Sequence, residues 1–280
     1  MQVDEERKGA AAADLDVGGY EDDSDDEREI KEQEEGAKDI HLNLNEAAEA
    51  ASEATILVVC QSSPAQCLAK IMYGANWNEI GEATSTKTST KGEVAATDKG
   101  PKTVLKLYAL SGASTVLFAL PEDKLSTDMI NPIVFKIFGW NYAIEKVVVL
   151  ADTYKTKYMN PEELANVPDG VLPMKTHKTS WVSAEDTQWL TSAIGEPSFF
   201  MAAATGFGAG CLTHCEMYGL SCIYVTLITD SHSVTTESMQ AYTPVLTHLS
   251  LPADTDEIFM KPSFRPILKE ANTRGNAIFS

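Results

Sequence analysis

The chain has 280 residues, of which 44% are hydrophobic, and a formal net charge of −19. Residues 1–54 hold 19 acidic and 5 basic side chains, so most of the negative charge lies there and the remainder carries only −5. A body without excess basic charge has little with which to neutralise phosphates, so we expect no nucleic-acid partner and no membrane partner.

The cysteines and the N-terminal residues indicate the compartment in which the protein works. Five cysteines, an odd number, lie inside apolar segments, which is typical of reduced thiols in an intracellular protein. Residues 1–26 contain no apolar stretch of the kind found in secretory signals. No segment approaches the ~20 apolar residues of a membrane-spanning helix. We expect a cytoplasmic protein that also has access to the nucleus.

Residues 1–53 are predicted to form a disordered acidic head. They contain the run Glu21-Asp22-Asp23-Ser24-Asp25-Asp26-Glu27 and almost no aromatic side chains, so burial there cannot offset the entropy lost on ordering. Such a head either attracts a basic partner or only keeps the protein soluble. The folded domain is expected to span residues 54–272, and residues 273–280 are expected to form a flexible C-terminal tail.

The folded domain opens with a predicted strand and helix. Residues 55–60 are a continuous apolar run, typical of a strand buried on both faces. Ser63 and Pro64 then suit the start of a helix that ends at Gly74. Residues 84–102, rich in Thr, Lys and Gly, predict an excursion from the domain, which is either a contact loop or a tolerated insertion.

Predicted strands and helices alternate through the rest of the domain. A β-hairpin is expected over residues 103–120, and apolar residues at helical spacing predict a helix over 125–140. A long polar loop is expected over 152–180. The remaining predicted strands cover 146–150 and 222–228, and the remaining helices cover 184–194, 199–218 and 235–246. This alternation predicts a layered α/β fold.

A glycine-rich segment, residues 206–210, has two interpretations. Glycines at a turn between a strand and a helix bring backbone amides close to phosphate. Here Ala202, Ala203 and Ala204 precede the glycines, and the helical pattern continues through them. We therefore favour a helix that packs closely against a neighbouring element.

Four side chains in the second half of the chain are candidates for a metal site: Cys211, His214, Cys215 and Cys222. The first three share one face of a predicted helix and could bind zinc together with the fourth. Their spacing matches no common zinc module, and Cys222 begins a strand. Buried thiols beside a partly exposed histidine are the favoured interpretation, and we expect neither a metal nor a cofactor.

Asp152, Asp230 and His232 lie just beyond the carboxyl ends of predicted strands, where open α/β sheets place ligand groups. The same Asp230-Ser231-His232-Ser233 segment is also typical of a loop that caps the following helix. A phosphorylase-like or hydrolase-like enzyme that uses these loops is the alternative hypothesis. The leading hypothesis assigns no catalytic residue.

The C-terminal residues Ile278, Phe279 and Ser280 place two hydrophobic side chains next to a carboxylate. A pocket can recognise such an element with a lysine for the charge and apolar walls for the side chains. Terminal residues also often fold back on their own domain. Spacing alone does not separate these two interpretations.

Several segments together resemble the family of proteasome assembly chaperone 1. They are residues 56–73, the Trp77-Asn78-Glu79-Ile80-Gly81 element, residues 223–230, the Ala241-Tyr242-Thr243-Pro244-Val245-Leu246 segment and the tail. The resemblance implies a single α/β domain with a central, mostly parallel sheet flanked by helices, in a layout like that of nucleoside phosphorylases. It also implies a heterodimer with proteasome assembly chaperone 2 on the 20S proteasome α-ring.

In that family a C-terminal motif of a hydrophobic residue, a tyrosine and any residue enters a pocket between neighbouring α subunits. The resemblance carries this role to Ile278, Phe279 and Ser280. The sequence departs from the motif because Phe279 lacks the phenolic hydroxyl, which removes a hydrogen bond worth ~0.5–1.5 kcal/mol. The leading hypothesis is therefore a non-enzymatic chaperone that assembles the α-ring and docks through its tail.

Overall fold

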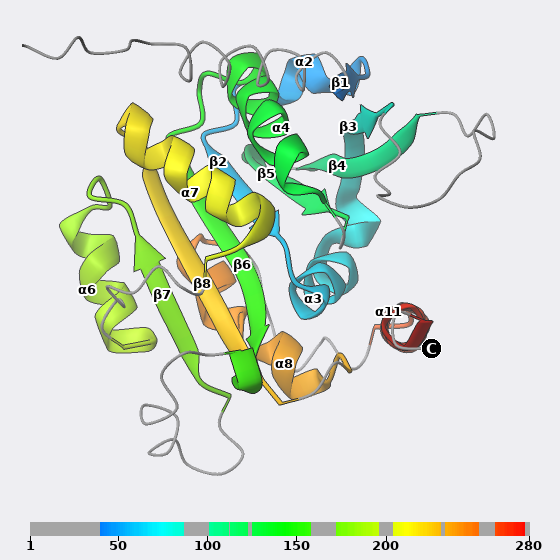
Figure 1. Ribbon diagram of the computed structural model, residues 1–280, viewed down its shortest axis with the longest axis vertical. Coiled ribbons are helices and arrows are strands. Elements are labelled where there is room, and N and C mark those ends of the chain that lie inside the picture. Colours follow the sequence, from blue (N-terminus) through cyan, green and yellow to red (C-terminus); the bar gives the residue numbers. More distant parts are fainter. Residues whose placement is uncertain are drawn as a thin grey trace, which may run out of the picture.

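The computed structural model describes residues 40–86, 101–111, 113–122, 125–157, 172–195, 204–230, 233–251 and 261–277. They form a three-layer α/β/α domain in which one sheet separates two layers of helices (Figure 1). The strands are β1 (Ile40–Leu44), β2 (Ile56–Cys60), β3 (Trp77–Ser85), β4 (Lys102–Leu110), β5 (Ala113–Pro121), β6 (Lys146–Tyr154), β7 (Met174–Lys178) and β8 (Ser221–Thr229). The helices are α2 (Ala47–Ala51), α3 (Ser63–Tyr73), η1 (Gly74–Asn76), α4 (Thr127–Trp140), η2 (Lys155–Lys157), α6 (Ala184–Ala193), α7 (Gly206–Tyr218), α8 (Thr236–Gln240), α9 (Thr243–His248) and α11 (Phe264–Ala277).

The described strands form one mixed sheet in the order β1-β3-β4-β5-β2-β6-β8-β7. Its four central strands, β5, β2, β6 and β8, run parallel to one another, and antiparallel strands extend the sheet on both sides. The predicted hairpin is confirmed as β4 and β5. The α/β fold is thus confirmed, with the parallel pairing confined to the centre of the sheet.

Alternating residues of the central strands pack on the two helical layers. In β6, Val147 and Val149 belong to the cluster that includes α4 and α7, whereas Val148 and Leu150 belong to the cluster under α3, α8 and α9. Because both faces are covered, these strands are apolar at nearly every position, which is why the sequence predicts them well. No helix in the described part of the chain is long and apolar enough to cross a membrane.

The folded domain begins by Ile40, and the predicted boundary at residue 54 is wrong. Residues 40–53 of the predicted head contain β1, which pairs with β3, and α2, whose Ala48 and Ala51 are buried. Asn45 fixes the turn between them, since its backbone N–H donates to Ile80 O and its side chain donates to Glu79 O. β1 is a short edge strand that is held by its pairing with β3. The alternation of Ile40, Leu42 and Leu44 with polar residues was the available signal of this strand. Residues 1–39 lie outside the described residues.

Two further differences concern segments that the sequence predicts as irregular. Residues 273–277 of the predicted tail continue helix α11, and Thr273 Oγ1 donates to Lys269 O at 2.8 Å. The predicted loop over 152–180 contains β7, which pairs antiparallel with β8. The sequence Met174-Lys175-Thr176-His177-Lys178 is too polar to suggest a strand, and β7 forms because an already buried strand offers it a hydrogen-bonding edge.

Candidate protein-interaction surface

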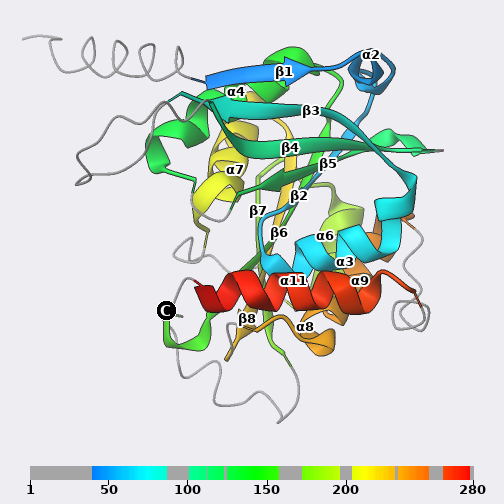
Figure 2. The same cartoon turned by 90° about the vertical axis from the view of Figure 1, so that its right-hand side faces the viewer.

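Helix α11 carries the chain toward the predicted docking residues. Figure 2 shows α11 lying alongside α3, where Phe264, Ile267, Leu268 and Ala271 pack on the core. Near the other end of α11, Asn272 Oδ1 accepts from the backbone N–H of Val234 at 2.8 Å, and Asn272 Nδ2 donates to Val234 O at 3.2 Å. Ile278, Phe279 and Ser280 themselves lie outside the described residues. They follow an anchored helix rather than the flexible spacer that the sequence suggested.

Most of the exposed large hydrophobic side chains on the described surface come from α4, α7 and the loop before α6. We define the aromatic patch as Phe135, His214, Met217, Tyr218 and Trp181. Phe135 is 47% exposed, Trp181 and Tyr218 are each 58% exposed, and Met217 is 70% exposed. The Phe135 ring makes T-shaped contacts with the rings of His214 and Tyr218 at centroid distances of 5.3 and 6.4 Å. Exposed apolar side chains gathered in this way are typical of a protein-binding surface.

His214 joins the rings of the aromatic patch to the core. Its ring lies 4.3 Å from the Phe138 centroid and 4.4 Å from the Tyr218 centroid. Nδ1 of His214 is buried, and no hydrogen-bond partner for it occurs among the described residues. Burial lowers the pKa of His214 below its ordinary value, so the imidazole is held neutral. A neutral ring packs between aromatic neighbours at little electrostatic cost.

Trp181 is held in place although most of its indole is exposed. Its Nε1 donates to Glu216 O at 3.3 Å, and the Glu216 carboxylate accepts from Ser180 Oγ at 2.7 Å and from Ser180 N at 2.8 Å. These hydrogen bonds, the side-chain one first, lower the pKa of Glu216, which keeps the carboxylate ionised. An aromatic side chain fixed before binding loses little conformational entropy when a partner covers it.

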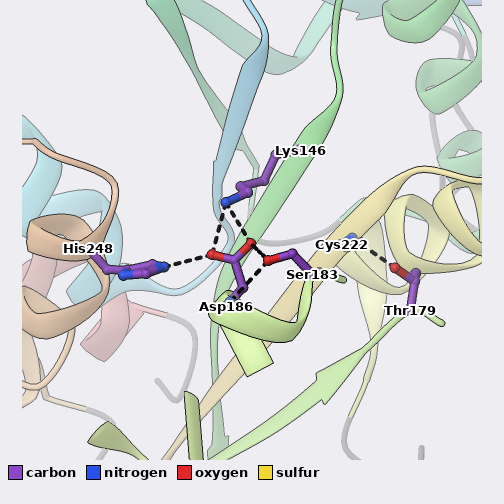
Figure 3. A network of polar contacts seen from close by, with 6 residues as sticks. All are labelled: Lys146, Thr179, Ser183, Asp186, Cys222 and His248. Carbon is purple, nitrogen blue, oxygen red and sulfur yellow. Dashed lines mark hydrogen bonds and ion pairs between the residues drawn. The ribbon is translucent and has the colours of Figure 1, made fainter. Parts of the chain in front are cut away.

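A partly buried ionic network supports the segment that carries Trp181 (Figure 3). Asp186, near the start of α6, accepts from Lys146 Nζ at 2.8 Å and contacts His248 Nε2 at 2.7 Å. Ser183 Oγ donates to the same carboxylate at 2.8 Å, and its side chain also caps α6. Nearby, Thr179 Oγ1 accepts from Cys222 N at 2.9 Å. Both ends of the Trp181 segment are thereby tied to the sheet.

Replacing Asp186 with asparagine is expected to lower the free energy of unfolding at pH 7 by roughly 1–3 kcal/mol, because Lys146 loses a buried counter-charge. Burial alone raises the pKa of Asp186, but hydrogen bonds from Lys146, His248 and Ser183 outweigh it and lower the pKa to about 2. A lowered pKa stabilises the fold above the unfolded value near 4, and this stabilisation is lost as the pH falls toward 2. The wild type should therefore lose stability in that window, and Asp186→Asn should lose less.

Urea unfolding of the wild type and of Asp186→Asn at pH 7 and pH 3 measures the free energy of unfolding at pH 7 and its fall toward low pH. Glu185→Gln is the matched control, since Glu185 lies next to Asp186 on α6 but is exposed. Equal stability of Asp186→Asn and the wild type at pH 7 would show that the network contributes nothing to the fold.

The glycine-rich segment lies at the start of α7, contrary to the expectation of a helix that continues through it. α7 begins at Gly206, and Gln61, just after β2, accepts from Gly208 N at 2.6 Å and donates to Thr205 O at 2.9 Å. A Cβ at Gly208 would overlap Val149 and come within 2.8 Å of Tyr224 Cε2. The expected close packing is therefore confirmed. The Gln61 side chain already accepts the hydrogen bond from the Gly208 amide.

The candidate zinc ligands do not converge on one point. Cys211, Cys215 and Cys222 are fully buried between α7 and the sheet, and burial raises the pKa of Cys211 and Cys222 well above the ordinary value. His214 instead belongs to the aromatic patch. In the described ranges no group of three metal-ligating side chains is placed to hold an ion.

The acidic residues at the strand ends are also separated. Asp152 lies opposite Leu227 in the pairing of β6 and β8, whereas Asp230 follows Thr229, which lies opposite Tyr154. Asp230 is mostly exposed and contacts Lys155 Nζ at 3.6 Å. His232 lies outside the described residues. In the described part of the chain, these residues form no cluster that would support the hypothesis of a phosphorylase-like or hydrolase-like enzyme.

Sequence reasoning missed the aromatic patch. The helical pattern of α4 assigns Ile130, Ile133, Val134 and Ile137 to the core, and Phe135 falls off that stripe. An aromatic residue outside the apolar stripe of a helix was the available signal. Trp181 gave no signal, since its role depends on the fold bringing residues 180 and 216 together.

Comparison with known proteins agrees with this architecture. The model of the family described as Proteasome assembly chaperone 4 matches residues 6–278. No curated protein sequence matches the chain. Similar solved structures include Pyrococcus furiosus PbaA, an archaeal homologue of proteasome-assembly chaperone, with a TM-score of 0.58 and 13% identity over 85% of this chain and 96% of that chain.

A second similar structure is Pyrococcus furiosus PbaB, an archaeal proteasome activator, with a TM-score of 0.57 and 11% identity over 87% of this chain and 100% of that chain. A third is a Thermoplasma acidophilum protein of unknown function, with a TM-score of 0.56 and 14% identity over 83% of this chain and 93% of that chain. At these identities the likeness concerns the fold, whereas the family match spans almost the whole sequence. The chain belongs to the proteasome assembly chaperone family.

Proposed function

We propose that the chain promotes assembly of the 20S proteasome α-ring as a heterodimer with proteasome assembly chaperone 2. The observation that carries this proposal is the family match over residues 6–278. Within the family, the resemblance of residues 56–73, 77–81 and 223–230 to proteasome assembly chaperone 1 favours the role of that member. The cytoplasm, with access to the nucleus, is the proposed place of action.

The aromatic patch supports the pairing step of this proposal. Its exposed rings lie on two packed helices and on a loop held by Glu216, so the surface is formed before a partner arrives. Well-packed aromatic anchors of this kind dominate the affinity of many protein interfaces. We propose that a second chaperone subunit covers this patch.

The tail supplies the contact with the α-ring. We propose that Ile278 and Phe279 enter a pocket between α subunits and that the carboxylate at Ser280 meets a basic side chain there. Helix α11, anchored through Asn272, would direct the tail away from the body. Docking of this kind requires neither a chemical step nor a cofactor, so the proposed role is non-enzymatic.

Co-expression of 20S α subunits with and without this chain and proteasome assembly chaperone 2 tests the proposal. Native gels should show more ring-sized α-subunit complexes when both chaperones are present than when either is omitted. The same yield of these complexes in all cultures would contradict a role in assembly.

Phe279→Tyr is expected to strengthen α-ring binding by up to about tenfold, because one hydrogen bond is worth ~0.5–1.5 kcal/mol. Titration of immobilised α subunits with the wild-type and variant heterodimers measures the change in Kd. Phe264→Tyr, at the other end of α11, controls for a general effect of an added hydroxyl. Weaker binding by Phe279→Tyr would show that the pocket excludes a hydroxyl and that the family motif does not apply here.

A further inference from the structure

The sheet ends at β1, and the outer edge of this strand is open. β1 pairs with β3 on one side, and no strand in the described part of the chain pairs with its other side (Figure 2). The sequence of β1 contains neither a charged residue nor a proline, with which proteins often protect an exposed edge. The opposite edge strand, β7, carries Lys175 and Lys178. The edge at β1 therefore lacks the protection that the edge at β7 has.

The pairing of β1 with β3 determines which backbone groups of β1 face outward. The N–H of Asn45 donates to Ile80 O at 2.9 Å, and the register of the two strands, continued by one residue, places these residues opposite each other. Because hydrogen-bonded pairs alternate along an antiparallel ladder, Asn43 also bonds toward β3. In agreement, Asn43 O lies 2.5 Å from the position that a Cβ on Gly81 of β3 would take.

Leu42 and Leu44 alternate with Asn43, so their backbone N–H and C=O groups point away from β3. The part of the chain that the structure describes offers these outward groups no hydrogen bond. Leu44 is 37% exposed, and Leu42 is partly exposed. Backbone groups at such an accessible edge bond either to water or to an added strand. Their spacing is that of the ladder that a new strand would continue.

The charges beside this edge select the kind of strand that fits it. Glu46 lies just before α2, Glu49 lies in α2 and Glu53 follows it, and all three are exposed. Among the described residues, none of them forms an ion pair. A segment with lysine or arginine side chains is attracted here. A second copy of the chain would instead bring its own residues 1–54, with 19 acidic and 5 basic side chains, against the same negative charge.

We propose that the outer edge of β1 is a strand-addition site, at which an extended, basic segment of a partner protein pairs with the backbone of Leu42 and Leu44. Main-chain hydrogen bonds supply the affinity, as in other complexes formed by strand addition. The basic side chains of the added strand meet the acidic residues around α2. This proposal is independent of the proposed function, which uses the aromatic patch and the tail.

Residue-resolved hydrogen exchange of the full chain, measured by NMR, tests the proposal with a short synthetic peptide of alternating valine and lysine. In the free chain, the amides of Leu42 and Leu44 should exchange rapidly, whereas that of Asn43 is protected by β3. At a peptide concentration about ten times its Kd, exchange at Leu42 and Leu44 should slow roughly tenfold. A peptide of the same sequence with N-methylated amides should have no effect, because it cannot donate main-chain hydrogen bonds.

Leu44→Pro and Leu44→Ala are matched variants for this site. Both remove the leucine side chain, but only proline removes the outward N–H, and an edge strand tolerates a proline at a position that faces solvent. Leu44→Pro should bind the peptide about threefold to tenfold more weakly than Leu44→Ala, while the circular dichroism of both stays that of the wild type. A peptide of alternating valine and glutamate should bind the wild type more weakly than the lysine peptide does.

Equal peptide binding by the two Leu44 variants would overturn the proposal, because binding would then not depend on the backbone of β1. Slow exchange of Leu42 and Leu44 in the dilute free chain would show that another segment of the same chain covers the edge. Protection that grows with the concentration of the chain alone would assign the edge to a second copy. Either result would overturn the proposal, and so would equal affinity for the lysine and glutamate peptides.

Discussion

Removal of residues 278–280 is expected to abolish recovery of 20S α subunits with the purified chaperone, while the thermal unfolding of the chain stays unchanged. Burial of Ile278 and Phe279 in a pocket would contribute about 1.5–3 kcal/mol each. Their joint loss corresponds to roughly a hundredfold to ten-thousandfold weaker binding. The fold should not change, because the described part of α11 packs through Phe264, Ile267, Leu268 and Ala271, which lie well before the deletion.

Ser280→Ala is the matched control for this deletion, since it keeps the length of the tail, both hydrophobic side chains and the carboxylate. Affinity capture through an N-terminal tag, with quantification of α subunits and of the second chaperone, compares the three proteins. Undiminished capture of α subunits by the deletion variant would assign docking to another surface.

Phe135→Asp is expected to disrupt the heterodimer with the second chaperone subunit. For a central anchor of the interface, the loss of binding free energy is about 2–4 kcal/mol. The charge would have to be buried among Tyr218, His214 and the partner's apolar surface. In the free chain the same charge is tolerated, since Phe135 is already 47% exposed. Analytical ultracentrifugation of the mixed subunits measures the loss of the heterodimer.

Tyr142→Asp controls for the general effect of placing a charge on an exposed aromatic position, because Tyr142 is 87% exposed and lies outside the aromatic patch. It should pair as the wild type does. Intact heterodimers with Phe135→Asp, or equal losses for both variants, would show that the aromatic patch is not the pairing surface.

The interior of the fold was the part most readily predicted from the sequence. β2, β6 and β8 are buried on both faces, so their burial is visible as uninterrupted apolar runs. The N-terminus of α3 was predicted to within one residue, because Pro64 suits its first turn, although Ser62 rather than Ser63 caps the helix. β1 and β7 lie at the two edges of the sheet and owe their structure to pairing with β3 and β8. The polar sequence of β7 leaves little local signal, whereas the alternating apolar residues of β1 were a signal within the predicted head.

The candidate surface was less predictable because it depends on juxtaposition. Phe135, Tyr218 and Trp181 come from three segments that are far apart in the sequence, and only the packing of α4, α7 and the loop before α6 brings them together. The docking role of the tail was inferred from its composition and from the family resemblance, and it stays a prediction. The anchoring of α11 could not be predicted, since the bonds between Asn272 and Val234 join residues 38 positions apart.

Native mass spectrometry of the complex captured through an N-terminal tag on this chain tests the central claim most directly. The account predicts a particle that contains one copy of this chain, one copy of proteasome assembly chaperone 2 and 20S α subunits. A chain recovered alone, or only with further copies of itself, would contradict it.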